Sequence, residues 1–347
     1  MARVYLDHNA TMPLRREARD AMIAAMDVVG NPSSVHAEGR AAKGVIERAR
    51  AQISDAIGAS GADIVFTSSA TEAAALACAG RGLQSAAVEH DAVAAWTSGD
   101  LPVDERGKVT VSDPERTALQ LANSETGILQ ELPEGLAVSD MTQAFGKIPV
   151  AFSWSGVDMA LISAHKLGGS KGVGALLLRQ GLDVEARIKG GGQEMGRRSG
   201  TENVIGIAGF GAAAEAAARD LAAGVWDRVA ELRNILEKAI EAETKNTILV
   251  GNGSDRLPNT LCFATPGWKG ETQVMAMDLA GFAVSAGSAC SSGKVKASRT
   301  VAAMGYDDTV AASTLRVSLG PDTTEEQILR FADAWLKAER KFHAKAA

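Results

Sequence analysis

Lys166 and Cys290 are the two residues of this sequence best placed to form covalent bonds during a reaction. Lys166 follows the apolar run 160–163 and precedes a glycine-rich turn. A lysine at the end of a buried strand is partly desolvated, which lowers its pKa and frees the amine to form a Schiff base. Cys290 stands among the small and polar residues of 285–293. Little would bury it there, so we expect an accessible and reactive thiol.

Polar side chains also follow other predicted strands. His90 closes the sequence V-E-H, and its imidazole ionises near neutral pH. Asp140 follows the apolar run 136–138, with Gln143 three residues later. An acid at the carboxyl end of a strand lies where open α/β sheets bind ligands. A structural histidine and a helix-capping aspartate are the alternative interpretations of His90 and Asp140.

A phosphate site is predicted where the strand 63–67 meets the next helix. The segment S-S-A-T-E, residues 68–72, brings hydroxyl groups and free backbone N–H groups to a helix N-terminus. Such an arrangement favours an anion. Ser69 and Glu72 also fit a capping box, which alone would explain both residues.

The spacing of apolar residues predicts two regions of different architecture. Helices are expected over 17–26, 38–57 and 69–79, and strands over 63–67, 86–88, 119–122, 136–138, 160–163 and 173–178. This alternation favours an α/β fold with a mostly parallel central sheet covered by helices. After a long helix over 226–242, short strands over 247–250, 260–264, 283–285 and 315–319 predict a smaller α+β domain. Thr323 and Glu326 fit a capping box for a last helix.

Composition excludes several classes of protein. A length of 347 residues suggests about two domains. The 36 Lys and Arg residues against 42 Asp and Glu residues leave a net charge of −6. This charge disfavours nucleic acid and anionic membranes as partners. We expect no membrane span and no apolar leader. Three widely spaced cysteines indicate neither disulfides nor a metal site and favour a reducing cytoplasm. Cys78 and Cys262 lie in apolar segments and are expected to be inert.

Eleven segments, taken in order, resemble a known family. They are Y-L-D-H-N-A-T, G-N-P-S-S-V-H, T-S-S-A-T-E, V-E-H, N-S-E-T-G, S-D-M-T-Q, S-A-H-K, G-G-G-Q-E, R-S-G-T-E-N, G-S-A-C-S-S-G and L-R-V-S-L-G. The chain resembles the pyridoxal-phosphate-dependent cysteine desulfurases of the nitrogen-fixation and iron–sulfur-assembly type, within the class V aminotransferases. The resemblance implies a fold-type I transferase with a cofactor-binding domain over 15–244. A small domain over 1–14 and 245–347 would carry the Cys290 segment.

The resemblance also assigns roles to individual residues. Lys166 would hold pyridoxal 5'-phosphate covalently, and His90 would stack on its ring and transfer protons. Asp140 would pair with the protonated ring nitrogen and keep the ring an electron sink, while Gln143 would contact the ring oxygen. The remaining cofactor contacts implied are Ala70, Thr71, Ser163, His165 and, from the partner subunit of a homodimer with shared active sites, Thr201.

The implied reaction converts L-cysteine to L-alanine. Arg316 and Asn123 would bind the substrate carboxylate, and Cys290 would take the sulfur as a persulfide. A sulfur-acceptor protein would then receive it for iron–sulfur cluster or thio-cofactor assembly in the cytoplasm.

Two alternatives stay open, because the chain departs from the usual family pattern at several places. Ala75, Ser124 and Pro321-Asp322 replace residues common in the family, and the segment 91–122 is short. One alternative is a selenocysteine lyase or another class V enzyme. The other is a catalytically silent homologue that binds partners in a sulfur relay.

Overall fold

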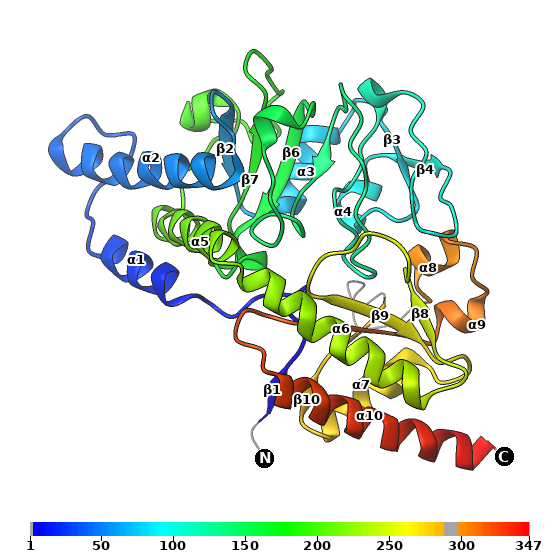
Figure 1. Ribbon diagram of the computed structural model, residues 1–347. Helices are drawn as coiled ribbons and strands as arrows, with labels where there is room; N and C mark the ends of the chain where they lie inside the picture. Colours follow the sequence, from blue (N-terminus) through cyan, green and yellow to red (C-terminus); the bar gives the residue numbers. More distant parts are fainter. Residues whose placement is uncertain (1–2, 288–296, 347) are drawn as a thin grey trace.

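The computed structural model describes residues 3–287 and 297–346, and Figure 1 shows that they form two lobes. The upper lobe contains β2, β6 and β7 with their covering helices, and the lower lobe contains β1, β9 and α10. Both described ends of the chain lie in the lower lobe. Within the described ranges, no helix has the length and apolarity that crossing a bilayer requires.

The sheet of the upper lobe is mostly parallel, as predicted. Its strands lie in the order β2 (Asp63–Thr67), β7 (Gly174–Leu178), β6 (Met159–Ser163) and β5 (Ser139–Asp140). Only β7 runs antiparallel to its neighbours, whereas β5 and β6 are parallel. Beyond β5 the backbone of Leu119 donates to Val138, and that of Ala118 donates to Gln84. These bonds continue the parallel ladder to β3 (Gln84–Ala86) and β4 (Ser98–Leu101).

Two predicted strands differ in detail from the structure. The strand expected over 86–88 lies over 84–86, because the backbone N–H of Glu89 turns back to the carbonyl of Ala86. The runs 119–122 and 136–138 contribute single bridges to the ladder rather than continuous strands.

Alternation along the strands sends side chains to two apolar layers. Ile64 and Phe66 of β2 face the layer formed by α1 (Arg16–Met26), α2 (Ala37–Ile57) and α5 (Val204–Ala222). Val65, between them, faces α3 (Ala70–Cys78) and α4 (Asp91–Ala94). Successive side chains of a strand point to opposite faces, so a sheet that is covered on both faces buries both sets. Figure 1 shows α2 and α5 on the side of the sheet away from α3.

The lower lobe has its own antiparallel sheet and its own core. The strands lie in the order β11 (Ser285–Ala286), β12 (Thr314–Ser318), β9 (Thr260–Ala264) and β8 (Ile248–Val250), while β1 (Val4–Tyr5) pairs with β10 (Phe282–Ala283). The core lies between this sheet and the helices α6 (Val225–Glu243), α7 (Gly270–Leu279) and α10 (Glu325–Ala346). Trp335 of α10 is fully buried there against Trp268 and Phe263.

Short helices connect these elements. They are α8 (Arg299–Ala303), α9 (Asp308–Ala311), η1 (Pro114–Arg116), η2 (Phe152–Trp154), η3 (Ala164–Lys166) and η4 (Gln193–Gly196). The domain boundary at residue 244 stays a prediction. The buried face of α6 packs in the core of the lower lobe, which favours a boundary before Val225.

The predicted capping box of the last helix forms one residue later than expected. The N–H of Gln327 donates to Thr324 Oγ1 at 3.3 Å, and the N–H of Thr324 donates to Gln327 Oε1 at 3.1 Å. The hydroxyl of Thr323 instead accepts from the N–H of Gly320 at 2.9 Å. That bond closes the preceding turn, so Thr323 is not the cap.

Candidate active site

Three strands of the upper-lobe sheet, β2, β5 and β6, end at the same edge. Most of the predicted site residues follow these strands. Thr67 of β2 and Ser163 of β6 both pair with Gly174 of β7, so β2 and β6 end level. Asp140 pairs with Leu161, so β5 ends beside β6. The carboxyl ends of parallel strands form the ligand-binding edge of an α/β sheet. The segments that follow β2, β5 and β6 therefore meet.

Lys166 lies in η3, the single turn that follows β6. Its Nζ donates to the backbone oxygens of Asn9 at 2.7 Å and Ala10 at 2.9 Å, and its side chain is half-buried. Two carbonyl oxygens from the N-terminal segment therefore hold the amine at the sheet edge.

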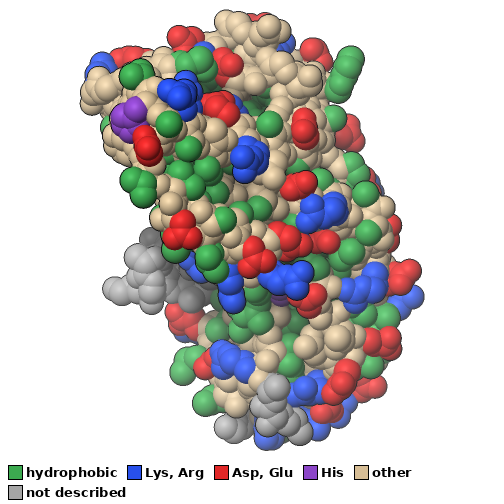
Figure 2. All heavy atoms as spheres, turned by 90° about the vertical axis from the view of Figure 1, so that its left-hand side faces the viewer, with side chains coloured by type: hydrophobic (Ala, Val, Ile, Leu, Met, Phe, Trp, Pro, Cys, Tyr) green, Lys and Arg blue, Asp and Glu red, His purple; other side chains and the backbone are tan. Residues whose placement is uncertain are grey.

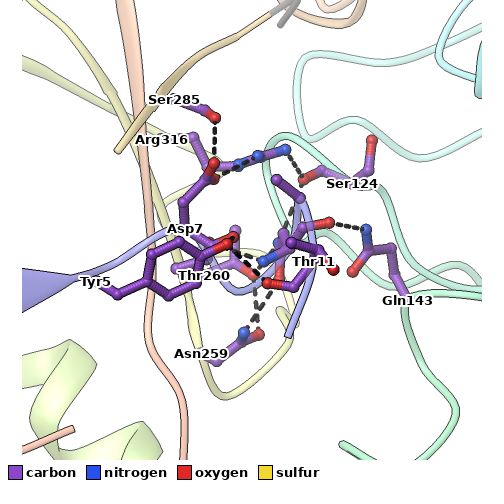
Figure 3. A network of polar contacts seen from close by, with 12 residues as sticks. Tyr5, Asp7, Thr11, Ser124, Gln143, Asn259, Thr260, Ser285 and Arg316 are labelled. Atoms are coloured by element: carbon purple, nitrogen blue, oxygen red, sulfur yellow. Dashed lines mark hydrogen bonds and ion pairs between the residues drawn. The ribbon is translucent and has the colours of Figure 1, made fainter. Parts of the chain in front are cut away.

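The segment 7–11 binds other predicted cofactor residues as well (Figure 3). The backbone oxygen of Asn9 accepts from Gln143 Nε2 at 3.0 Å, and the hydroxyl of Thr11 lies 3.2 Å from His165 Nδ1. Burial, followed by nearby lysine charges, lowers the pKa of His165 to about 4. At neutral pH this imidazole is uncharged, so it would contact a phosphate as a hydrogen-bond donor rather than as a cation.

The same segment holds the predicted substrate arginine. Asp7 Oδ1 forms an ion pair with Arg316 at 2.8 Å, and Asp7 Oδ2 accepts from the Ser285 hydroxyl at 2.8 Å. Arg316 also donates from its Nη1 atom to the backbone oxygen of Ser124 at 3.0 Å. Figure 3 shows Arg316 between Asp7 and Ser124, with Ser285 on the other oxygen of Asp7. Ser124 departs from the family pattern in its side chain. The acceptor of this hydrogen bond is its backbone oxygen, so the departure does not remove the bond.

Both predicted substrate residues already have protein partners. Arg316 is 3% exposed, and two of its N–H groups have partners, on Ser124 and Asp7. Its Nε atom is buried without a partner among the described residues, so this N–H is one of those left for an anion. Asn123 donates to Val88 at 3.0 Å and weakly to Thr300 at 3.5 Å, while its Oδ1 accepts from the N–H of Glu125 at 2.9 Å. A substrate carboxylate would therefore displace the long contact to Thr300.

Asp140 lies beside a buried acid that the sequence did not single out. Its Oδ1 accepts from the N–H of Thr142 at 2.9 Å, which fixes the carboxylate at the end of β5. Glu89 is 3% exposed, and its Oε1 accepts from the N–H of Gln120 at 2.7 Å. Burial and the nearby charge of Asp140 raise the pKa of Glu89 well above its usual range. Burial therefore favours the protonated form of Glu89.

The orientation of His90 follows from its position as the N-cap of α4. Its Nδ1 accepts from the backbone N–H of Ala92 at 3.1 Å. Because Nδ1 acts as the acceptor, the neutral imidazole carries its proton on Nε2. The ring is half-buried, and the cap bond fixes the direction of its Nε2–H.

The N-terminus of α3 is capped as predicted. An ion pair also joins it to the loop that carries Thr201. Ser69 Oγ accepts from the N–H of Glu72 at 3.3 Å, and Glu72 Oε2 accepts from the N–H of Ser68 at 2.7 Å. Glu72 also binds Arg198 Nε at 2.8 Å. The capping interpretation is therefore correct, and it coexists with the exposed Thr71 hydroxyl at the same helix end.

Gly174 lets β7 approach this helix end, which leads to a prediction for Gly174→Ala. A Cβ at this position would lie 2.5 Å from the backbone carbon of Ser69 and 2.8 Å from the backbone nitrogen of Ala70. Because main-chain atoms cannot rotate away, the start of α3 must shift. We expect at least about a tenfold loss of affinity for pyridoxal phosphate in a spectroscopic titration. We also expect a loss of about 1–3 kcal/mol in the free energy of unfolding.

Gly44→Ala is the matched control for this variant. Gly44 lies in α2 with nothing within 4 Å of the added Cβ, so cofactor affinity should not change. Stability should rise by about 0.5–1 kcal/mol, because alanine favours a helix interior. Wild-type affinity in Gly174→Ala would show that the start of α3 is not the phosphate site.

The described structure thus brings part of the predicted set together. Lys166, Gln143, His165 and Arg316 all contact the segment 7–11. The other predicted residues stand on other elements: His90 caps α4, Asp140 ends β5, and Thr201 lies just before α5. Cys290 lies outside the described residues, so its predicted role rests on the sequence.

Besides Glu89, two polar groups near the site were missed by sequence reasoning. Lys147 is buried against Gln143 and Asn9. Glu194 is buried against Arg50, with its oxygens 3.0 and 3.1 Å from the guanidinium, and it clamps the loop before Thr201. Glu194 stands in a polar stretch of sequence, where nothing signals burial, and Lys147 is a single charge between apolar residues.

Comparison with known proteins identifies the family. Residues 4–99 and 97–331 match the class V aminotransferases. A cysteine desulfurase from Cereibacter sphaeroides is 39% identical over 371 residues, covering 96% of this chain and 95% of the relative. The cysteine desulfurase IscS of Dictyoglomus turgidum is 37% identical, covering 94% of this chain and 91% of the relative.

A solved structure agrees with these relatives. The X-ray structure of a NifS-like protein from Rickettsia africae superposes with a TM-score of 0.87 at 31% identity, covering 96% of this chain and 99% of that chain. The fold-type I architecture implied by the sequence motifs is therefore confirmed. The chain belongs to the class V aminotransferase family, within its group of cysteine desulfurases.

Proposed function

We propose that this chain uses pyridoxal 5'-phosphate to convert L-cysteine to L-alanine and that Cys290 receives the sulfur as a persulfide. The observation that carries the proposal is the position of Lys166. Its amine is held by two carbonyl oxygens at the edge where β2, β5 and β6 end. The group of relatives supports the substrate assignment.

The donor groups at this edge fit the cofactor. The start of α3 offers backbone N–H groups and the Thr71 hydroxyl to a phosphate. Asp140 offers a carboxylate to a protonated ring nitrogen, while burial raises the pKa of the neighbouring Glu89 and disfavours a second negative charge there. When bound, pyridoxal phosphate supplies an electron sink for the charge that develops at the substrate Cα.

The residues of this chain would move the protons and orient the substrate. Lys166 Nζ would take the proton from the substrate Cα, after exchanging its carbonyl partners for the substrate. His90 Nε2 is the proton-bearing atom of its ring and would act as a donor to the product. Arg316 would bind the substrate carboxylate through Nε, whose N–H has no partner among the described residues.

Sulfur transfer would be a nucleophilic displacement. The thiolate of Cys290 attacks the substrate sulfur, a sulfur–sulfur bond forms, and the bond between Cβ and sulfur breaks. The electron pair of the broken bond stays on Cβ, which takes a proton, and alanine leaves. The persulfide holds sulfur in a transferable form. An acceptor protein with a free thiol would receive it for iron–sulfur cluster or thio-cofactor assembly.

A homodimer with shared active sites is the second part of the proposal. The loop 198–203 is anchored to the phosphate-binding helix end through Arg198 and Glu72, yet Thr201 is exposed. Glu194 and Met195, just before this loop, have left-handed φ angles of 48° and 57°. Non-glycine residues adopt such angles at a cost, which is common at functional sites.

Apolar side chains near this loop support a surface for a second copy. Ile23, Met26, Val29 and Val35 are exposed at the end of α1 and in the α1–α2 connection. This side of the molecule faces the viewer in Figure 2, which shows hydrophobic side chains exposed between charged ones. Clusters of exposed apolar side chains are typical of protein interfaces.

Mixed dimers test whether Thr201 acts on the partner's site. Lys166→Ala and Thr201→Ala would each lower activity as pure dimers. Co-expressed, they would form mixed dimers in which one site has both an intact Lys166 and an intact Thr201 from the other subunit. We expect the mixture to be more active than the sum of the two variants. A monomer by light scattering, or purely additive activities, would contradict the shared site.

The competing functions are less favoured. The relatives are named cysteine desulfurases, so a selenocysteine lyase is not the preferred assignment. A silent homologue is disfavoured because Lys166, Asp140 and His90 are all present with ordered partners. We place the enzyme in the cytoplasm, where Cys78 and Cys262, both free thiols, would stay reduced.

A spectroscopic assay tests the proposal. Protein reconstituted with pyridoxal phosphate should be yellow, its band should shift when L-cysteine is added, and alanine and sulfide should form in the presence of a thiol reductant. L-selenocysteine and L-cysteine sulfinate serve as comparison substrates. A band that does not respond to L-cysteine, with neither product formed, would show that the substrate is wrong, and absence of a band would favour the silent homologue.

A further inference from the structure

Lys147 is a buried lysine that the proposed mechanism does not use. It is 1% exposed, and its Nζ donates to Gln143 Oε1 at 2.7 Å and to Asn9 Oδ1 at 3.2 Å. None of its contacts among the described residues is with a carboxylate. Burying an ammonium group without an opposite charge is unfavourable, so such a lysine is seldom kept for stability alone.

The surroundings of Lys147 all act against its charge. Burial lowers its pKa well below the usual range, and the positive charges of Lys166 and Arg316 act in the same direction. His8 is also near, and burial with the charge of Lys147 lowers the pKa of His8 to about 4. The two hydrogen bonds of Lys147 need only two N–H groups, so the neutral amine can form both.

Lys147 contributes to the orientation of two side-chain amides. Its N–H groups face the oxygens of Gln143 and Asn9, so the nitrogen of each amide must face elsewhere. Gln143 Nε2 then donates to the backbone oxygen of Asn9 at 3.0 Å. Asn9 Nδ2 donates to Thr260 Oγ1 at 2.8 Å in the lower lobe. Asn259 Nδ2 also donates to Asn9 Oδ1, at 3.0 Å. Lys147 therefore orients the amide of Gln143 and reinforces an orientation of Asn9 that Asn259 shares.

Gln143 and Asn9 link Lys147 to the amine of Lys166. The backbone oxygen of Asn9 that accepts from Gln143 also accepts from Lys166 Nζ. A rotated Gln143 amide would place its carbonyl against the carbonyl of Asn9 and push the segment 7–11 away. The contacts that hold Lys166 would then loosen.

We propose that Lys147 is a positioning residue: it locks the amide of Gln143 and the turn at Asn9, and thereby sets both the N–H group that Gln143 presents to the cofactor and the place of Lys166 Nζ. The inference rests on the proposed function, because it concerns the same site. It adds a residue that touches neither substrate nor cofactor.

Lys147→Met tests this inference, because methionine is similar in size and has no N–H group. We expect about a tenfold weaker affinity of the cofactor-free protein for pyridoxal phosphate. We also expect kcat to fall about tenfold, with the KM for L-cysteine changed less than about twofold. Lys147→Gln keeps an N–H donor and should recover part of both losses. Lys337→Met, on the exposed face of α10, is the control and should behave as wild type.

A double-mutant cycle separates positioning from general stability. If Lys147 acts through Gln143, then Gln143→Leu combined with Lys147→Met should bind the cofactor no more weakly than Gln143→Leu alone. Additive losses would overturn the proposal, as would Lys147→Met with wild-type affinity and kcat, whatever its melting temperature. If Lys147→Met does not fold, the same cycle is run with Lys147→Gln.

Measurements on the wild-type protein distinguish failure of the proposed function from failure of the role of Lys147. If it binds no pyridoxal phosphate, the proposed function fails. If it binds the cofactor and turns over L-cysteine while the Lys147 variants match it, only the role of Lys147 fails.

Discussion

Replacing Lys166 with alanine should abolish covalent attachment of the cofactor and reduce turnover of L-cysteine by at least about 10³-fold. The physical reason is that one amine would perform two tasks: it would hold the cofactor and take the Cα proton. The start of α3 and Asp140 do not depend on that amine. Pyridoxal phosphate should therefore still bind without a covalent bond and with lower affinity.

Borohydride reduction followed by peptide mapping measures this directly. Wild-type protein should carry the reduced cofactor on the peptide that contains Lys166, and Lys166→Ala should carry none. Lys171→Ala is a close control, because Lys171 is exposed five residues away and should leave attachment intact. Reduced cofactor on another lysine of active wild-type protein, with Lys166 unlabelled, would contradict the assignment.

Replacing Cys290 with alanine should leave the visible band of the bound cofactor unchanged and reduce sulfide formation by at least about 10²-fold. Cofactor contacts assigned to Lys166, Asp140 and the start of α3 lie on other elements, so they should survive. The sulfur acceptor would be missing, and only a slow direct attack by added thiol would remain.

Cys78→Ala is the matched control for this variant. Cys78 is fully buried, and burial raises its pKa to about 12, so it carries no thiolate at neutral pH. Its removal should lower stability slightly and leave turnover intact. Normal sulfide formation by Cys290→Ala would show that the sulfur reaches the solvent by another route.

Local patterns were sufficient to predict much of the fold. The 3.6-residue spacing of Ile46, Ile53 and Ile57 predicted α2, whose apolar face packs on the sheet. The strand ends at Thr67 and Ser163 could also be placed from sequence, because apolar runs stop there. Short strands were harder. The start of β3 depends on the turn from Ala86 to Glu89, a tertiary contact that no periodicity encodes.

The site was predictable in its residue types but not in its connections. The strand ends indicated Lys166 and Asp140. The sequence did not show that Asn9 and Asp7, more than 150 residues before Lys166 and Arg316 respectively, would hold those side chains. The burial of Lys147 and Glu89 was also hidden, because a charged residue is usually exposed. Their partners, Asn9 and Gln120, lie far away along the chain.

The most direct test of the central claim is a single-turnover experiment with reconstituted wild-type protein and L-cysteine, without any added thiol. Alanine and protein-bound sulfur are quantified, and the sulfur is located by peptide mass mapping. We predict equal amounts of alanine and protein-bound sulfur, with one additional sulfur atom on the peptide containing Cys290. Free sulfide released together with pyruvate, with no sulfur bound to the protein, would contradict a desulfurase and indicate a lyase instead.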